Sequence, residues 1–332
     1  MSRLVVVRRR FRLAETFTIS RGSRDEVETV EAVISDGARE GRGECVPYAR
    51  YGETVEEVMA AIEAMAGAVA DGLDRAALQE AMPAGAARNA LDCAFWDLEA
   101  KRAGCRVWEL DAWAAAGGRA PEPVETAYTL SIAEPEAMRA AAARNAGRPI
   151  LKVKLKGDAH DAARIAAVRE GAPDARLVVD ANEGWSAEGY AGAVEAMASA
   201  GVEMIEQPLH ADGDGALADL PRPVALCADE SCHDRASLDA LVGRYDMVNI
   251  KLDKTGGLTE ALALRAEAEA RGMTVMIGCM MSSSLGCAPA VALGASVALV
   301  DLDPPLLLAE DREPPLRVEG ALVHPPEPAL WG

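Results

Sequence analysis

The chain has 332 residues, with 34 Lys and Arg against 53 Asp and Glu, which gives a formal net charge of −19. A surface this acidic repels phosphate backbones and anionic membranes, so we expect neither nucleic acid nor a membrane as a partner. Half of the residues are hydrophobic and only 4% are aromatic, which predicts a large core built from aliphatic side chains. The length favours two domains, or one barrel with an attached domain.

Cysteine usage and the two most apolar segments bear on the compartment. The chain has seven cysteines, an odd number, and none is spaced as C-x-x-C, which favours reduced thiols in a cytoplasmic protein. The apolar run at the start is too short for a signal peptide. The uncharged stretch 272–300 is interrupted by Ser, Gly and Pro, which is typical of a strand, a loop and a buried helix rather than a membrane span.

The first part of the chain predicts a small α+β domain, to which we assign residues 1–118. Leu4–Leu13 and Glu26–Ser35 alternate or run apolar, as antiparallel strands do. Helical patterns follow at about 53–71 and 85–103. Strands followed by helices indicate an α+β unit.

From residue 119 the chain alternates between short apolar runs and Ala-rich helical patterns. The runs are Ala127–Ile132, Ile150–Leu155, Leu177–Asp180, Val202–Glu206, Val224–Asp229, Met247–Leu252, Thr274–Ile277 and Val297–Leu302. Alternation of strand and helix implies parallel pairing, and eight is the strand count of a (β/α)₈ barrel. We therefore predict an α/β protein with a modified (β/α)₈ TIM barrel over residues 119–311, whose proline-rich tail 312–332 returns to the first domain.

Acidic residues close three successive strands of the predicted barrel. They are Asp180, Glu206 and Asp229. Because the C-terminal ends of barrel strands face the active site, we expect these carboxylates to converge there. Like charges brought together need a cation, and carboxylate oxygens favour Mg²⁺, or Mn²⁺ as a substitute. A single such Asp would be better explained as the cap of the following helix, but three in consecutive strands favour a metal site.

Lysines stand on two strands that face each other across the predicted barrel. Lys152 and Lys154 are two residues apart on the second strand, so both side chains point into the barrel mouth. Lys251 closes the sixth strand, opposite Lys154. A buried ammonium must be paired or lose its proton. We expect Mg²⁺ and the proximity of Lys152 and Lys154 to lower the pKa of these two lysines, which would turn a cation into a base. A base on each face of one carbon is what a racemisation needs, with Lys152 and the metal holding the enediolate.

At these residues the chain resembles the enolase superfamily, in its muconate-lactonizing branch. The matching segments are Lys152–Lys154, Val179–Asn182, Ile205–Pro208, Ala228–Ser231 and Asn249–Gly257. Residues 45–51 and 85–98 also look like the capping domain of the dipeptide epimerases within that branch. The resemblance implies a TIM barrel with an N-terminal α+β capping domain, catalytic Lys154 and Lys251, and a Mg²⁺ site.

The resemblance also implies a set of substrate contacts. Asp301 and Asp303 on the last strand match the Asp-x-Asp that holds the substrate α-ammonium group in dipeptide epimerases. Thr129 corresponds to the family's threonine on the first strand, and Lys152 would contact the substrate carboxylate. Arg24, in the loop expected at 20–24, matches the arginine that faces the Glu side chain in members acting on acidic dipeptides, a task that suits its bidentate fork. The alternative for Arg24 is a solvated loop arginine.

The function implied is epimerisation of a dipeptide at the α-carbon of its C-terminal residue. L-Ala-D/L-Glu is the expected substrate, with recycling of murein peptides as the context and a homo-oligomer as the assembly. One alternative is a lyase of the same branch, an o-succinylbenzoate synthase or a muconate-type cycloisomerase, whose substrates have no ammonium group for Asp301 and Asp303. The other is a non-catalytic barrel that serves as a binding protein.

Overall fold

A long antiparallel hairpin begins the chain. The computed structural model describes residues 2–332, so Met1 of the predicted first domain lies outside the described residues. Strands β1 (Arg3–Ile19) and β2 (Gly22–Ser35) pair along their length, and β3 (Glu40–Cys45) adds to β2. The loop expected at 20–24 is wrong, because the strands continue to a two-residue turn at which Gly22 has a φ of 139°.

Helices cover one face of this sheet. They are α1 (Val55–Ala64), α2 (Ala66–Ala70), α3 (Arg75–Ala81) and α4 (Ala86–Ala103). The helical patterns predicted from the sequence are thus confirmed, the first as two helices. Helix α4 lies directly on β3, since a methyl group at Gly43 would overlap the carbonyl oxygen of Ala90 and lie 2.8 Å from the nitrogen of Ala94. The close approach therefore requires glycine.

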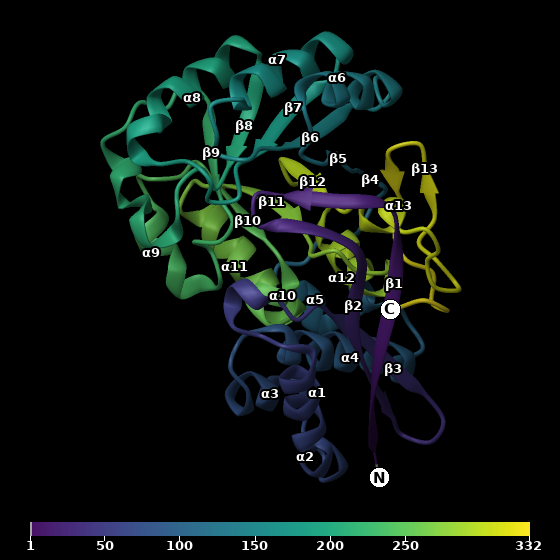
Figure 1. Cartoon of the computed structure of the whole chain (residues 1–332). Coiled ribbons are helices and arrows are strands. Elements are labelled where there is room, and N and C mark those ends of the chain that lie inside the picture. Colours follow the sequence, from purple (N-terminus) through teal and green to yellow (C-terminus); the bar gives the residue numbers. More distant parts are fainter. Residues whose placement is uncertain (1) are drawn as a thin grey trace.

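The eight predicted barrel strands are all present, and they form one parallel sheet in sequence order (Figure 1). They are β5 (Tyr128–Leu130), β6 (Ile150–Lys154), β7 (Arg176–Asp180), β8 (Val202–Glu206), β9 (Ala225–Ala228), β10 (Met247–Ile250), β11 (Thr274–Gly278) and β12 (Leu299–Asp301). A parallel bridge between Thr126 and Val300 joins the two edges and closes the barrel. The predicted TIM-barrel fold is therefore confirmed.

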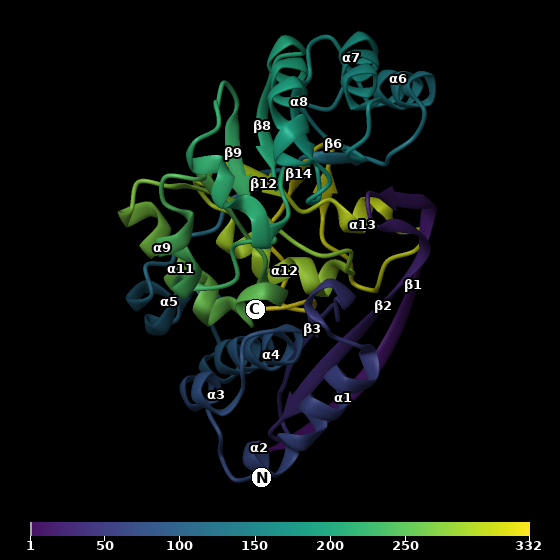
Figure 2. The same ribbon diagram turned by 60° about the vertical axis from the view of Figure 1, so that its left-hand side comes forward.

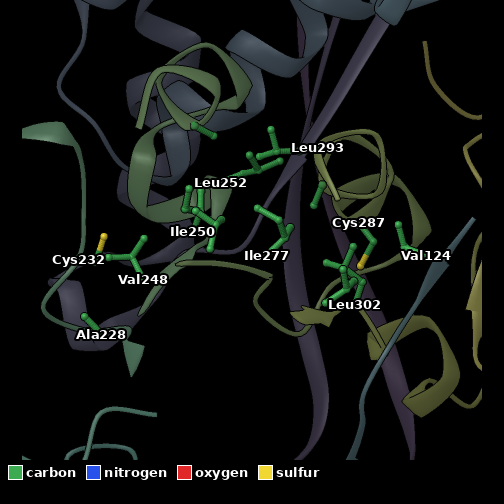
Figure 3. Packing of buried hydrophobic residues seen from close by; sticks show 14 of the residues in the cluster. Val124, Ala228, Cys232, Val248, Ile250, Leu252, Ile277, Cys287, Leu293 and Leu302 are labelled. Atoms are coloured by element: carbon green, nitrogen blue, oxygen red, sulfur yellow. The ribbon is translucent and has the colours of Figure 1, made fainter. Parts of the chain in front are cut away.

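Helices connect the strands and surround them (Figures 1 and 2). The α-helices are α5 (Asp111–Ala115), α6 (Pro135–Arg144), α7 (Asp161–Gly171), α8 (Ala187–Ser199), α9 (Leu238–Leu241), α10 (Leu252–Thr255), α11 (Leu258–Ala270), α12 (Ser284–Leu293) and α13 (Pro304–Leu307). The 3₁₀ helices are η1 (Ala49–Tyr51), η2 (Val107–Glu109), η3 (Ala211–Ala218) and η4 (Arg235–Ser237). Buried Val, Leu and Ile side chains such as Val248, Ile250 and Leu293 fill the space between strands and helices (Figure 3).

A separate apolar cluster fills the barrel interior. One residue comes from each strand within its first three positions, or, for β5, from the position just before it: Ala127, Ile150, Val178, Met204, Cys227, Met247, Met276 and Leu299. Side chains two positions apart on a strand point the same way. The next inward-facing residue of each strand therefore lies one layer closer to the C-terminal mouth of the barrel.

The C-terminal tail touches both parts of the molecule. Strands β13 (Val318–Glu319) and β14 (Leu322–Val323) form a small sheet with β4 (Val124–Glu125). The indole nitrogen of the buried Trp331 then donates to the carbonyl oxygen of Cys93 in α4, at 3.1 Å. The domain boundaries at 118/119 and 311/312 stay predictions. Within residues 2–332, no helix combines the length and the apolar character that crossing a membrane requires.

The contact between β3 and α4 generates a stability prediction. Gly43→Ala should destabilise the protein by about 3 kcal/mol or more, because the new methyl group meets the helix backbone, which cannot rotate away. Gly67→Ala in α2, where no atom lies within 4 Å, is the control and should stabilise by up to about 1 kcal/mol. Urea unfolding of both variants measures the effect, and equal midpoints would contradict the close approach.

Candidate active site

The polar residues at the barrel mouth form the layer directly above the apolar interior. Seven of them lie two positions after a residue of that interior: Thr129, Lys152, Asp180, Glu206, Asp229, Asn249 and Asp301. All seven are buried. Because side chains two positions apart on a strand point the same way, these charged groups, far apart in the sequence, come together at the barrel mouth.

Lys152 lies among three carboxylates. Its Nζ is 2.6 Å from Glu206 Oε2, 2.6 Å from Asp301 Oδ2 and 3.5 Å from Asp180 Oδ2. The contact with Asp301 is a hydrogen bond, whereas the contact with Glu206 is an ion pair without hydrogen-bond geometry, since Glu206 Oε2 has no hydrogen-bond partner. The Lys152 ammonium, on β6, thus bridges carboxylates on β7, β8 and β12.

Lys154 and Lys251 lie on opposite sides of the same cavity. Four strand positions separate β6 from β10 in the eight-stranded barrel. Lys154 donates to Asp180 at 2.6 Å, and Lys251 donates to Asp229 at 2.7 Å. Both lysines line the cavity and are only 7% exposed. Two ammonium groups thus face one small space from two directions.

The carboxylates around Lys152 and Lys251 raise the pKa of both lysines, and the lowering expected from Mg²⁺ stays a prediction. Burial by itself lowers the pKa of Lys251, but the charges of Asp229 and Glu206 outweigh burial and raise it well above its ordinary value. For Lys152, burial likewise lowers the pKa, and Asp301, Glu206 and Asp180 together raise it further. The physical reason is that carboxylates, and not only other cations, surround each ammonium.

Two further residues of the site escaped the sequence reasoning. Asn249 lies on β10, two residues before Lys251, and its side chain donates to Glu206 Oε1 at 2.7 Å. Lys254, in α10, is 2% exposed and donates to Asp229 Oδ1 at 2.6 Å. Asn249 could have been found by stepping two residues along the strand from Met247. The position of Lys254 cannot be found by stepping along the strand, because Lys254 lies in α10, after the chain has left β10.

The donor set at the barrel mouth fits a hard cation. Buried oxygens without a hydrogen-bond donor gather here: Asn182 Oδ1, Glu206 Oε2, Asn249 Oδ1, Asp301 Oδ1 and both carboxylate oxygens of Glu230. Glu206 Oε2 and Glu230 Oε1 lie 2.6 Å and 2.8 Å from the cations of Lys152 and Arg21. The remaining oxygens are acceptors that a bound cation would satisfy. As they stand, no three Asp, Glu, His or Cys side chains within residues 2–332 are grouped closely enough to hold a metal, and lysine ammonium groups lie between the carboxylates. The metal-ligand roles of Asp180, Glu206 and Asp229 stay predictions.

Asp301 and Asp303 form an acidic pair beside the lysines. Asp303 Oδ2 accepts a hydrogen bond of 2.6 Å from the backbone nitrogen of Thr129. Burial, together with the charge of Asp301, raises the pKa of Asp303 to about 7. Asp301 Oδ1 has no donor. A second cationic group, such as a substrate ammonium, would therefore be stabilised here.

The capping domain closes the cavity from above. Its contribution comprises Phe17, Ile19, Arg21, Arg24, Val46, Tyr48 and Tyr51. Arg24 lies in β2 and not in a loop, opposite Phe17 on β1. Directly opposed residues of an antiparallel pair point to the same face, and both line the cavity. Arg24 forms no ion pair with any of residues 2–332, whereas Arg21 is paired with Glu230 at 2.8 Å.

Comparison with known proteins places this site among enzymes. A family model described as the mandelate racemase/muconate lactonizing enzyme N-terminal domain matches residues 1–110, and one described as enolase C-terminal domain-like matches residues 136–329. The L-Ala-D/L-Glu epimerase of Escherichia coli is 48% identical over 93% of this chain and 95% of its own length. An N-acetyl-D-glutamate racemase from Pseudoalteromonas is 42% identical, over 91% of this chain and 95% of its own.

Solved structures agree with these relatives. An enolase family member from Agrobacterium tumefaciens, crystallised with sodium and L-Ala-L-Glu, is 53% identical over the full length of both chains, with a TM-score of 0.96. A dipeptide epimerase from Enterococcus faecalis, in complex with Mg and L-Leu-L-Tyr, is 30% identical over 98% of this chain and 97% of its own, with a TM-score of 0.89.

The surplus of acceptors generates a prediction about metal binding. Mg²⁺ at 100 times its Kd should stabilise the protein by about 2.7 kcal/mol, which raises Tm by about 4 °C in a protein of this size, and EDTA should reverse the shift. Asp229→Asn should lose the response, because it removes a ligand charge. The control is Asp212→Asn, whose carboxylate is exposed and outside the site, and it should respond as the wild type does. The same shift in wild type and Asp229→Asn would contradict the assignment.

Proposed function

Because this chain belongs to the mandelate racemase/muconate lactonizing enzyme family of the enolase superfamily, we propose that it epimerises dipeptides. The reaction inverts the α-carbon of the C-terminal residue, and L-Ala-D/L-Glu is the substrate that the site suits best. The observation that carries the proposal is the placement of Lys154 and Lys251 on opposite strands, both buried and both lining one cavity.

The two lysines transfer the proton. One lysine, as the free amine, removes the α-proton from one face of the carbon, and the other, as the ammonium, returns a proton to the opposite face. The reverse reaction exchanges their roles. Each lysine is hydrogen-bonded to its own carboxylate, Asp180 or Asp229, which keeps its Nζ directed at the cavity. Positioned acid–base groups of this kind contribute about 10²–10⁴-fold each to the rate.

The remaining charged groups hold the substrate carboxylate as it becomes an enediolate. Lys152, fixed by Glu206 and Asp301, supplies a positive charge where negative charge develops. Asp180, Glu206 and Asp229 are the residues that would hold Mg²⁺. When bound, Mg²⁺ neutralises the charges that raise the lysine pKa and stabilises the developing negative charge on the substrate.

Asp301, Asp303 and Arg24 determine the substrate class. The acidic pair on β12 suits a free α-ammonium group, which marks the N-terminus of a dipeptide. Arg24, which has no carboxylate partner among residues 2–332, suits the side-chain carboxylate of Glu. N-acetylglutamate, the substrate class named for the Pseudoalteromonas relative, has the second group but lacks the first. A lyase substrate lacks it too.

The cellular setting belongs to the same proposal. Recycling of murein peptides, which contain L-Ala-D-Glu, is the context that such an activity serves. A cytoplasmic location is supported by the seven cysteines, all of which are free thiols in the described chain. The homo-oligomeric state stays a prediction.

Proton NMR in D₂O tests the reaction directly. With enzyme and Mg²⁺, L-Ala-L-Glu should lose its Glu α-proton signal while the signals of the diastereomer appear, and EDTA should stop both changes. Lys154→Met and Lys251→Met should each slow epimerisation by at least about 10³-fold, because one proton transfer has lost its base or acid.

The two lysine variants also have a stereochemical signature. Each retains one base, so each should still exchange the α-proton of one epimer with solvent, and the two variants should act on opposite epimers. If both variants exchanged the same epimer, the lysines would not lie on opposite faces of the carbon. Absence of exchange by the wild type with any dipeptide would refute the proposed activity itself.

The acidic pair on β12 separates the dipeptide from the N-acetyl substrate. The wild type should act on L-Ala-L-Glu with a kcat/KM at least about 100-fold above that for N-acetyl-L-glutamate, since each unpaired buried charge costs several kcal/mol. Asp301→Asn with Asp303→Asn should remove this preference. Steady-state polarimetry on both substrates measures it, and preference for the N-acetyl compound by the wild type would reverse the assignment.

A further inference from the structure

The distal end of the β1–β2 hairpin carries capping residues to the cavity. The register of the two strands shifts between Arg12 and Phe17, so an irregularity separates segment 17–24 from the rest of the sheet. Figure 2 shows the two strands running from the capping helices toward the barrel. An irregularity of this kind bends a hairpin. The position of Arg24 therefore depends on what the tip of the hairpin contacts.

The tip is docked on the barrel loop that follows β7. The Ser20 hydroxyl and the Arg21 guanidinium both donate to the carbonyl oxygen of Asn182, each at 3.1 Å. Arg21 also lies 2.8 Å from Glu230 and 3.5 Å from Glu183. Arg21, a capping arginine, is thus paired with two carboxylates of the barrel.

A second capping segment reaches the same barrel carboxylate. Arg50, in η1, donates two hydrogen bonds of 2.7 Å, one to each side-chain oxygen of Glu183. Such bidentate pairs fix geometry as well as charge. Tyr48, beside η1, accepts a hydrogen bond of 2.9 Å from Arg21 through its hydroxyl. Glu183, whose side chain is 5% exposed, is therefore the point at which both capping segments meet the barrel.

The loop that carries Glu183 is held in a strained conformation. Asn182 and Glu183 have φ values of 44° and 66°, in the left-handed region that side chains rarely adopt. The Glu183 nitrogen donates to the carbonyl oxygen of Gln207, and its Oε1 accepts from the Ala211 nitrogen, each at 2.9 Å. Strain of this kind persists only where the surroundings impose it, and it is concentrated at functional positions.

We propose that Glu183 is a positioning residue that determines specificity for acidic substrates. Glu183 binds Arg50 in η1 and lies 3.5 Å from Arg21 at the hairpin tip, which also donates to Tyr48 beside η1. It thereby supports the tip so that the unpaired guanidinium of Arg24 meets the side-chain carboxylate of the substrate's C-terminal residue. Arg24 contacts the substrate, and Glu183 acts through the two other arginines. The inference rests on the proposed function and extends it from the barrel to the junction between barrel and cap.

The test compares L-Ala-L-Glu with L-Ala-L-Gln, which has the same shape and no side-chain charge. For Glu183→Gln, the ratio of kcat/KM between the two substrates should fall at least about tenfold, through a higher KM for L-Ala-L-Glu. Activity on L-Ala-L-Gln should stay within about threefold of the wild type, because the Thr18 carbonyl still binds the Ile132 nitrogen and keeps the hairpin near the barrel. A merely structural role would lower both activities equally and leave the ratio unchanged.

A double-mutant cycle ties the effect to Arg24. In an Arg24→Ala background, Glu183→Gln should change the ratio no further, because the group that it positions is gone. Arg50→Ala, at a partly exposed site, is the second variant and should lower the ratio in the same way. The matched control is Glu260→Gln, which removes a bidentate pair with Arg235; neither residue lines the cavity, and the variant should leave the ratio unchanged.

Amide hydrogen exchange reports on the junction independently of turnover. Residues 17–24 should exchange at least about tenfold faster in Glu183→Gln than in the wild type or in Glu260→Gln. Unchanged exchange, or an unchanged substrate ratio in an active enzyme, would overturn the proposal. A wild type that epimerises no dipeptide but shows the exchange difference would refute the function while leaving Glu183 as the anchor of the hairpin, without a role in specificity.

Discussion

Mutual compensation of buried charges is the interaction on which the rest of the structure depends. Lys152, at 1% exposure, is enclosed by Glu206, Asp301 and Asp180. An isolated ammonium or carboxylate at this depth would cost several kcal/mol, so neither set could be buried without the other. The barrel must therefore close in one register, since a slip of one residue would turn every one of these groups away from its partners.

The same compensation bears on catalysis, because it fixes the charged groups before a substrate binds. Groups that hold each other in place in a dry environment need little rearrangement when charge develops on a substrate. The oxygens that remain without donors, on Asn249 and Asp301, show that the compensation is incomplete. These are the oxygens that a bound metal ion and a substrate ammonium group would satisfy.

The capping domain completes the site by a different kind of contact. Its residues reach the cavity on a hairpin tip and on η1, and both are fastened to the loop after β7. The barrel supplies groups whose geometry is fixed by strand pairing, whereas the cap supplies Arg24 and the tyrosines, whose geometry is fixed by ion pairs at a junction. The barrel and the cap thus hold their cavity residues in place by different kinds of contact.

The sequence by itself determined the barrel, its eight strands, and the inward placement of Lys152, Lys154, Asp180, Glu206 and Asp229, because a period of two residues is a local property of a strand. It also indicated the acidic pair on the last strand, through resemblance. Only the tertiary structure shows how carboxylates raise the pKa of Lys152 and Lys251, that Lys254 is buried, and that Arg24 lies in a strand. Each of these depends on groups that are distant in sequence, such as the carboxylates around Lys251 or the barrel loop beneath the hairpin, and no local pattern records such distances.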